Sequence, residues 1–212
     1  MTNTTQGQEL IRAVKEADSA YSLVKAVKAL ANARLEAGIP TLIAVLSYNN
    51  PGAAGVAAGG LVGLGKTAVA QLLNLIDDYN YGGRAWAIRA LAAIGDPRAL
   101  DTLIEAAESD FAMSVRRAAT KGLGNLDWED MPKDKIPAAQ EQAFKTLLLT
   151  CQDTEWVVRY SSVVGLQGLA TAVVVTYPDL AETIKTHLAQ MFKTETDVTV
   201  GTRIQLAIQQ LA

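Results

Sequence analysis

The sequence is poor in the residues that build disulfides, metal centres and nucleophilic sites. It has one cysteine, Cys151, and one histidine, His187, among 212 residues. A lone cysteine cannot form an internal disulfide, which suits a reducing compartment, and no basic residue or histidine stands beside Cys151 to lower its pKa. We therefore expect an unreactive thiol at this position. His187 has no second ligand at metal-binding spacing, so we expect a surface histidine and no metal site.

Positive charge and long apolar runs are lacking as well. The 19 Lys and Arg residues are outnumbered by 22 Asp and Glu residues, which gives a formal net charge of −3. A net acidic chain is a poor candidate for nucleic-acid binding. No 18 consecutive residues are apolar, and the first ten lack a basic start followed by an apolar core. The sequence therefore predicts no membrane span, no secretory signal and a cytoplasmic location.

What the chain does have is an apolar half and an internal repeat. Residues 56–65, 85–95, 115–126 and 158–169 carry closely similar sequences. The recurring leucine or isoleucine of each unit falls at Leu30, Leu61, Leu91, Leu123, Leu166 and Ile208. Self-similarity at a period of a few tens of residues is typical of stacked supersecondary units, which usually act through an extended surface.

Each unit has the pattern of a helical hairpin. In residues 115–126, Val115, Ala119 and Leu123 fall on one helical face, and a second amphipathic run precedes each such helix. Small residues among them allow close helix contacts. The sequence 95–97, Gly-Asp-Pro, supplies a helix stop, a cap and a first-turn proline between units. These patterns predict an all-α chain, a right-handed α-α superhelix.

The spacing of the units predicts where they differ. The first three intervals are 30 to 32 residues, whereas the last two are 43 and 42. The polar stretch 127–138, with two prolines, is expected to be an inserted loop, and the apolar residues 172–175 are expected to lengthen a helix. We predict one solenoid domain over 1–212 with about six helical hairpins, and disorder over 1–7. The apolar C-terminal run is either the last packed helix or partly a docking surface.

Three segments carry a more specific resemblance: residues 48–54, 77–91 and 110–119. They are similar to the HEAT-like repeat bilin lyases that act in phycobilisome assembly, specifically to the smaller F (beta) subunits of the E/F-type phycocyanobilin lyases. The resemblance implies a HEAT-like repeat solenoid. It runs through most of the chain and is weakest after about residue 127.

The resemblance also implies an activity and its partners. An F-type subunit forms a heterodimer with a related E-type (alpha) subunit. The pair attaches phycocyanobilin, the substrate rather than a cofactor, through a thioether to a cysteine of the apo-phycocyanin alpha subunit, and can also detach or transfer it. No cofactor, nucleic acid or membrane is implied. A related isomerising pair has an adjacent His-Cys, whereas His187 and Cys151 are far apart here, which favours simple attachment.

A bilin needs cations for its two propionates, carboxylates for its pyrrole nitrogens and aromatic surfaces for its rings. Residues 77–89 contain all three kinds of side chain, with Trp86 and Arg89 adjacent at i and i+3. The candidate catalytic residues are Asp77 and Asp78. The candidate substrate-binding residues are Tyr79, Tyr81, Arg84, Trp86, Arg89, Arg116, Arg117, Trp156, Arg159 and Tyr160.

Each candidate has a structural alternative. Arg84, Arg116 and Arg159 share one repeat position, where arginine commonly pairs with an acidic residue of the next unit. Asp77 and Asp78 also fit a solvated helix end, and the two tryptophans fit packing positions. The alternatives stay open at the level of sequence.

Residues 60–67 match the phosphate-binding pattern G-x-x-x-x-G-K-[ST]. That loop requires a buried strand before it and a helix after it, whereas Leu61 and Leu64 occupy the core register of a repeat helix. We expect no nucleotide site there. Besides a lyase subunit, the sequence allows a non-catalytic adaptor or chaperone for apo-phycobiliprotein, and more remotely a nucleotide hydrolase.

Overall fold

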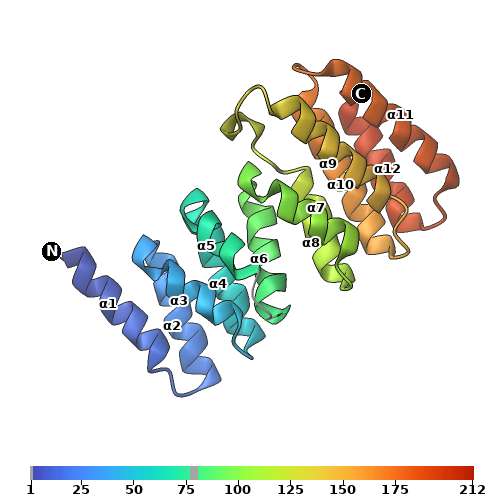
Figure 1. Cartoon of the computed structure of the whole chain (residues 1–212). Coiled ribbons are helices and arrows are strands. Elements are labelled where there is room, and N and C mark those ends of the chain that lie inside the picture. Colours follow the sequence, from blue (N-terminus) through green and yellow to red (C-terminus); the bar gives the residue numbers. More distant parts are fainter. Residues whose placement is uncertain (1, 77–80) are drawn as a thin grey trace. The chain divides into compact units, whose positions relative to one another are not determined.

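The computed structural model describes residues 2–76 and 81–212, and the secondary structure of these residues is helical, without strands (Figure 1). The α-helices are α1 (Thr2–Lys15), α2 (Ala20–Ala33), α3 (Ile39–Leu46), α4 (Pro51–Leu64), α5 (Lys66–Ile76), α6 (Tyr81–Ile94), α7 (Leu100–Ser109), α8 (Met113–Leu123), α9 (Ile136–Thr150), α10 (Trp156–Val173), α11 (Pro178–Thr194) and α12 (Val198–Leu211). Three 3-10 helices join them: η1 (Glu36–Gly38), η2 (Pro97–Ala99) and η3 (Trp128–Asp130). Taken in pairs, the α-helices give six successive hairpins, which confirms the predicted all-α repeat architecture.

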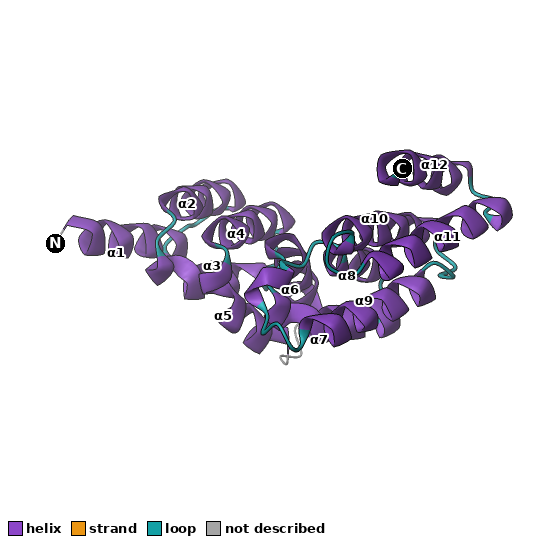
Figure 2. Cartoon of the chain, turned by 90° about the horizontal axis from the view of Figure 1, so that it is seen from above, coloured by secondary structure: helices purple, strands orange, loops and turns teal. Residues whose placement is uncertain are grey.

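The chain divides into two compact units, Met1–Ile94 and Gly95–Ala212. In the first, α2, α4 and α6 pack side by side as one layer and α3 and α5 form the second (Figure 2). Close packing here depends on Gly60, because a Cβ at this position would lie 2.6 Å from the Cβ of Ala31. Helix α1 packs on α2 and begins at Thr2, within the segment for which the sequence predicted disorder.

In the second unit, α8, α10 and α12 pack in order as one layer, and α7 and α9 pack as the other, with α11 lying against α10 and α12 (Figure 2). Glycines bring α8 and α10 into backbone contact: a Cβ on Gly124 would lie 2.3 Å from the carbonyl oxygen of Gly165. A Cβ on Gly168 would lie equally close, 2.3 Å, to the carbonyl oxygen of Gly124. The small residues of the repeat therefore set the distance between neighbouring helices, as predicted.

The second unit opens with the predicted stop, cap and proline. Gly95 has a φ of +75° and approaches Asn125 so closely that a Cβ would lie 2.4 Å from the Asn125 carbonyl oxygen. Asp96 accepts a hydrogen bond from the Arg98 amide, and Pro97 begins η2. Only glycine fits both the left-handed backbone and the contact, so this position fixes the break between α6 and η2.

The two longer repeat intervals have the expected origins. Helix α10 has 18 residues and α11 has 17, against 11 for α8, so the second interval contains longer helices, although α10 ends at Val173, before the end of the predicted stretch 172–175. The first interval contains the insertion between α8 and α9, which is anchored by the buried side chain of Trp128 in η3. The insertion ends earlier than the predicted residue 138, because α9 begins at Ile136 with Pro137 in its first turn.

The nucleotide-like string 60–67 is part of this helical packing. Leu61 is fully buried, Leu64 is half-buried and ends α4, and Gly65 (φ +65°) separates α4 from α5. No strand precedes it in the described residues, so the backbone cannot form a phosphate-binding loop. The combined range Pro51–Ile76 is apolar and long enough to cross a membrane, but Gly65 breaks it into helices of 14 and 11 residues. Each is shorter than the roughly 20 residues of a span.

Candidate functional site

The predicted site residues fall into three groups. Asp77, Asp78 and Tyr79 lie outside the described residues, and Tyr81 is the first residue of α6. Three further residues lie on α6 in the first unit, and five lie on α8 and α10 in the second: Arg84, Trp86 and Arg89, then Arg116, Arg117, Trp156, Arg159 and Tyr160. Each unit is therefore described separately.

On α6, Trp86 and Arg89 form a cation–π pair. The guanidinium carbon of Arg89 lies 4.7 Å from the centre of the Trp86 ring, as expected for residues at i and i+3. Both side chains are half-buried, and Trp86 also approaches α4, where a Cβ on Gly55 would lie 3.4 Å from its ring. The tryptophan thus combines packing with a cationic partner. Arg84 is half-buried two residues before it.

In the second unit, Arg116 has the structural role that the repeat position allowed. Its Nε and Nη2 donate to the two carboxylate oxygens of Asp153, at 2.7 and 3.1 Å. Its Nη1 donates to the carbonyl oxygens of Asp110 and Phe111, in the loop before its own helix. One guanidinium therefore ties its own loop to the loop of the next hairpin, 37 residues along the chain.

Arg159 repeats the arrangement one hairpin later. It donates to both carboxylate oxygens of Glu195 at 2.9 Å, and its Nη1 donates to the carbonyl oxygens of Asp153 and Thr154. We call the two pairs, Arg116–Asp153 and Arg159–Glu195, the arginine ladder. The acidic residues also cap their loops, since Asp153 accepts from the Glu155 amide at 2.8 Å.

The ladder holds its carboxylates in the charged form. Burial alone would raise the pKa of Asp153, but hydrogen bonds from Arg116 and the Glu155 amide outweigh it, and the pKa lies below its usual value. The hydrogen bonds from Arg159 likewise lower the pKa of Glu195, whose side chain is only 4 % exposed. Each of the two guanidinium groups uses its Nε and Nη2 in a bidentate pair with a largely buried carboxylate. The structure therefore shows Arg116 and Arg159 in structural ion pairs between hairpins, which is the alternative to bilin binding.

The ladder fixes three loops whose following helices begin with exposed apolar residues. Met113, Trp156 and Val198 are the first residues of α8, α10 and α12 and occupy the same repeat position. They are 48 %, 44 % and 83 % exposed. Trp156 is therefore not a core residue. Arg117, one turn after Met113, is exposed.

A second cluster of the same unit contains a residue that the sequence analysis missed. Arg203 of α12 lies over the ring of Tyr160 of α10, with its guanidinium carbon 6.0 Å from the ring centre. Its Nη2 donates to the side-chain oxygen of Gln167, whose amide nitrogen donates to Gln210 at 2.6 Å. Burial lowers the pKa of Arg203, partly offset by Tyr160. One signal was available in the sequence: no acidic residue lies three or four positions from Arg203.

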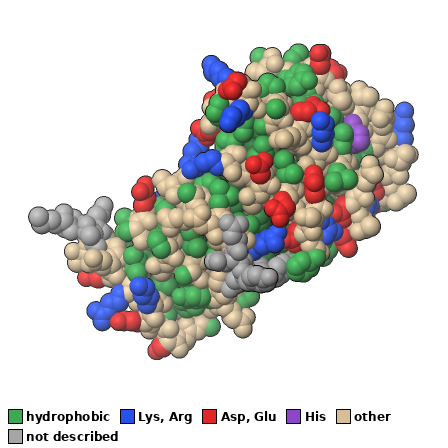
Figure 3. Space-filling model, in the orientation of Figure 1, with side chains coloured by type: hydrophobic (Ala, Val, Ile, Leu, Met, Phe, Trp, Pro, Cys, Tyr) green, Lys and Arg blue, Asp and Glu red, His purple; other side chains and the backbone are tan. Residues whose placement is uncertain are grey.

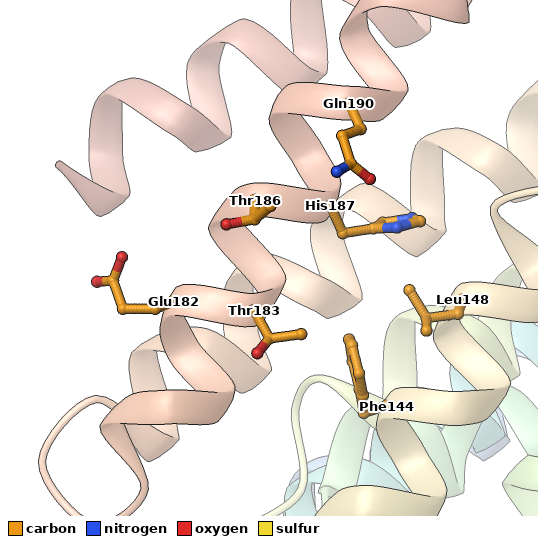
Figure 4. A pocket seen from close by; sticks show the side chains of 7 residues that line it. All are labelled: Phe144, Leu148, Glu182, Thr183, Thr186, His187 and Gln190. Atoms are coloured by element: carbon orange, nitrogen blue, oxygen red, sulfur yellow. The ribbon is translucent and has the colours of Figure 1, made fainter.

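A groove of about 460 Å³ lies between α9 and α11, on the other layer of the second unit (Figure 4). Its lining residues are Phe144, Leu148, Glu182, Thr183, Thr186, His187 and Gln190. His187 is half-buried rather than simply at the surface, because its ring lies beside Leu148, and burial lowers its pKa. The ring is therefore neutral at pH 7, and no Lys or Arg lines the groove.

Outside these clusters, the described residues contain few groups suited to nucleophilic or metal chemistry. Cys151 is buried, which raises its pKa to about 12, so the thiol is protonated and unreactive at neutral pH. No group of three metal-ligating side chains occurs among the described residues. On the face shown in Figure 3, basic and acidic side chains are interspersed. The described residues of that face form no continuous area of one charge.

Comparison with known proteins gives consistent matches. The family model for HEAT repeats matches residues 39–124 and 69–167. The phycocyanobilin lyase subunit beta of Nostoc sp. is 54 % identical over 202 residues, which cover 95 % of this chain and 98 % of that protein. The phycocyanin alpha phycocyanobilin lyase CpcF of Synechocystis sp. is 46 % identical, with 98 % and 95 % covered.

Solved structures agree. The complex of CpcE and CpcF of phycocyanin lyase from Nostoc sp. contains a chain that is 56 % identical, with a TM-score of 0.73, covering 81 % of this chain and 98 % of that one. A designed armadillo repeat protein is 16 % identical with a TM-score of 0.61, covering 96 % of this chain and 98 % of its own. The second likeness concerns the fold alone.

Proposed function

Because this chain belongs to the family of HEAT-repeat phycocyanobilin lyase beta subunits, we propose that it is the beta subunit of a heterodimeric bilin lyase. The enzyme attaches phycocyanobilin through a thioether to a cysteine of the phycocyanin alpha subunit. The observation that carries this proposal is 54 % identity over 95 % of the chain and 98 % of a lyase beta subunit. The likeness extends over nearly the whole length of both chains rather than over a few repeats.

The partner follows from the same family. A chain 56 % identical to this one forms a complex with CpcE, and we propose that this protein likewise acts with an E-type alpha subunit. The exposed apolar residues of the described chain, such as Phe111 and Trp156, are in line with a protein that works in contact with others. We further propose a cytoplasmic location and no resident cofactor, with the bilin as substrate.

The reaction needs no nucleophile from this chain. The sulfur of the apoprotein cysteine adds to a carbon–carbon double bond of the bilin, a new carbon–sulfur bond forms, and the thiol proton ends on the bilin, so nothing is released or oxidised. The inert, buried Cys151 is compatible with this reaction, since it would not compete as an acceptor. The task of the lyase is then to hold bilin and thiol in a reactive orientation.

Among the predicted residues, Trp86, Arg89 and Arg117 are the best placed for bilin binding. Trp86 and Arg89 are already stacked, which offers a ring surface beside a cation, and Arg117 is exposed. We propose that Trp86 and Arg89 bind a ring and a propionate of the tetrapyrrole, and that Arg117, in the other unit, is a separate candidate for propionate binding. Asp77 and Asp78 remain our candidates for the carboxylates that favour the protonated, electrophilic bilin.

The test is reconstituted transfer. This chain and its E-type partner are mixed with phycocyanobilin and apo-phycocyanin alpha, and covalent adduct is followed by zinc-induced fluorescence after denaturing electrophoresis. Adduct that requires this chain supports the proposal. The Arg89→Ala, Arg117→Ala double variant is expected to lower the initial rate about tenfold or more, because each arginine contributes a charge-assisted hydrogen bond.

The matched control removes a cation elsewhere on the surface: Lys193→Ala, at the exposed end of α11, should leave the rate unchanged. Stabilised apoprotein without adduct would contradict the lyase proposal and favour a non-catalytic adaptor. An unchanged rate in the double variant would remove Arg89 and Arg117 from the binding site.

A further inference from the structure

Arg203 differs from the other arginines of its layer in what surrounds it. Arg116 and Arg159 each pair with a buried carboxylate. Arg203 is half-buried to a similar extent, yet its recorded contacts are the ring of Tyr160 and the amide oxygen of Gln167, both uncharged. Its Nη1 is buried without a hydrogen-bond partner among the described residues.

A partly buried guanidinium without a carboxylate is costly. Desolvation disfavours the charged form, and it lowers the pKa of Arg203 whereas the pKa values of Arg116 and Arg159 are raised. Tyr160 and Gln167 meet the guanidinium with a phenol ring and an amide oxygen, and neither is a carboxylate. The cluster therefore lacks a negatively charged group to pair with the guanidinium of Arg203.

The surroundings of Arg203 suit an amphipathic anion with an aromatic or conjugated body. Leu206, three residues on and hence on the same side of α12, is 44 % exposed. The ring of Tyr160 and the half-buried Val164, one turn apart on α10, add further apolar surface. Gln167 and Gln210 supply polar groups at the edge. A bare aspartate or glutamate of a partner protein would use the cation but leave the apolar neighbours exposed.

We propose that Arg203, Tyr160 and Gln167 form a carboxylate-binding site, and that its ligand is a propionate group of the linear tetrapyrrole. This assignment rests on the proposed function, because the bilin is the substrate that brings both a carboxylate and a conjugated ring system. The guanidinium binds the carboxylate, Tyr160 and Leu206 contact the adjacent ring, and Gln167 holds the guanidinium in orientation. Arg203 thus becomes a substrate-binding residue.

The test compares the free bilin acid with its dimethyl ester, whose propionates carry no charge. The heterodimer of this chain with its E-type partner is titrated with each compound and binding is followed by absorbance. Arg203→Gln is expected to raise the Kd of phycocyanobilin about tenfold, because a charge-assisted hydrogen bond is lost. The same variant should leave the Kd of the dimethyl ester unchanged, since the ester never uses the cation.

Two further variants serve as controls for the comparison between the free acid and the dimethyl ester. Arg203→Lys retains the charge but not the planar fork, and it should bind the free acid with an intermediate Kd. Lys193→Gln removes a cation from an exposed position of the same unit and should change neither Kd. If Arg203→Gln proves poorly folded by its melting curve, the acid-to-ester comparison is made on Arg203→Lys, which must then discriminate less than the unmodified chain.

Several outcomes overturn the assignment. Equal weakening for acid and ester would mean that Arg203 supports the site only structurally. Unchanged acid binding with loss of affinity for the E-type partner or apo-phycocyanin alpha would assign the cation to a protein carboxylate instead. The proposed function is judged separately, by transfer with the unmodified chain. If transfer occurs but Arg203→Gln binds bilin normally, only this site fails; if binding depends on Arg203 but no adduct forms, the lyase proposal fails.

Discussion

Two arginine systems lie in the same helix layer of the second unit and have different roles. The arginine ladder joins successive hairpins at the start of α8, α10 and α12, with every fork of Arg116 and Arg159 engaged by the protein itself. Two positions later in the repeat, Arg203 of α12 stacks on Tyr160 without a carboxylate. In this unit, the arginines at the repeated position are structural elements, whereas the arginine outside that position is a candidate for ligand binding.

The largest expected effect comes from the loss of one ion pair of the arginine ladder. Arg159→Met would leave Glu195 buried at 4 % exposure without its cation, and we expect the free energy of unfolding to fall by about 3 kcal/mol. Urea denaturation followed by circular dichroism measures it. The matched variant Arg203→Met should cost less than about 1 kcal/mol, because it leaves no carboxylate unpaired. A larger loss for Arg203→Met than for Arg159→Met would refute the distinction between the two systems.

Acid should weaken the ladder selectively. Asp153 and Glu195 have pKa values below their ordinary ones, so the unfolded chain binds more protons near pH 4 than the folded chain does. The stabilisation is fully present above roughly pH 5 and is lost as the pH falls through about 4 towards the lowered pKa values. Melting temperatures measured from pH 7 to pH 3 should fall less steeply in Arg116→Met, Arg159→Met than in the unmodified chain. Parallel curves of melting temperature against pH would show that other carboxylates dominate the loss of stability in acid.

The smallest effect on stability is expected for Arg117. Its exposed side chain makes none of the recorded ion pairs, so Arg117→Ala should change the free energy of unfolding by less than about 0.5 kcal/mol. A several-fold fall in bilin transfer at unchanged stability would place it with Arg203 among the binding residues. Lowered stability with unchanged transfer would instead place it with the ladder. Both quantities are measured on the same preparation.

Much of the fold could be predicted because its determinants are local. Helical spacing around Leu91 and Leu123, the stop at Gly95 and the turn chemistry of Pro97 act within a few residues and give the same result in any copy of the repeat. The exclusion of a phosphate-binding loop at 60–67 followed from the same register. The sequence predicted disorder over 1–7, whereas α1 begins at Thr2; a polar segment shows no core pattern of its own, and the helix as a whole packs on α2.

The candidate site was less predictable, because it depends on contacts between hairpins. The stacking of Trp86 and Arg89 could be foreseen from their i, i+3 spacing. The structure added that the side chains of Arg117 and Trp156 are exposed. Arg203 was passed over because its one sequence signal, the lack of an acidic residue three or four positions away, is weak by itself. Its significance comes from Tyr160, which lies in another helix.

By itself, the sequence determined the repeat, the all-α class, the glycine contacts and the resemblance that the comparisons bear out. Only the tertiary structure decided which cations are satisfied. Arg116 and Asp153 are 37 residues apart, and Arg159 and Glu195 are 36 apart. Their pairing exists only once the hairpins are stacked. Periodicity reports forces that act within one helix, whereas the partner of a charge is chosen by packing, and packing left Arg203 without one among the described residues.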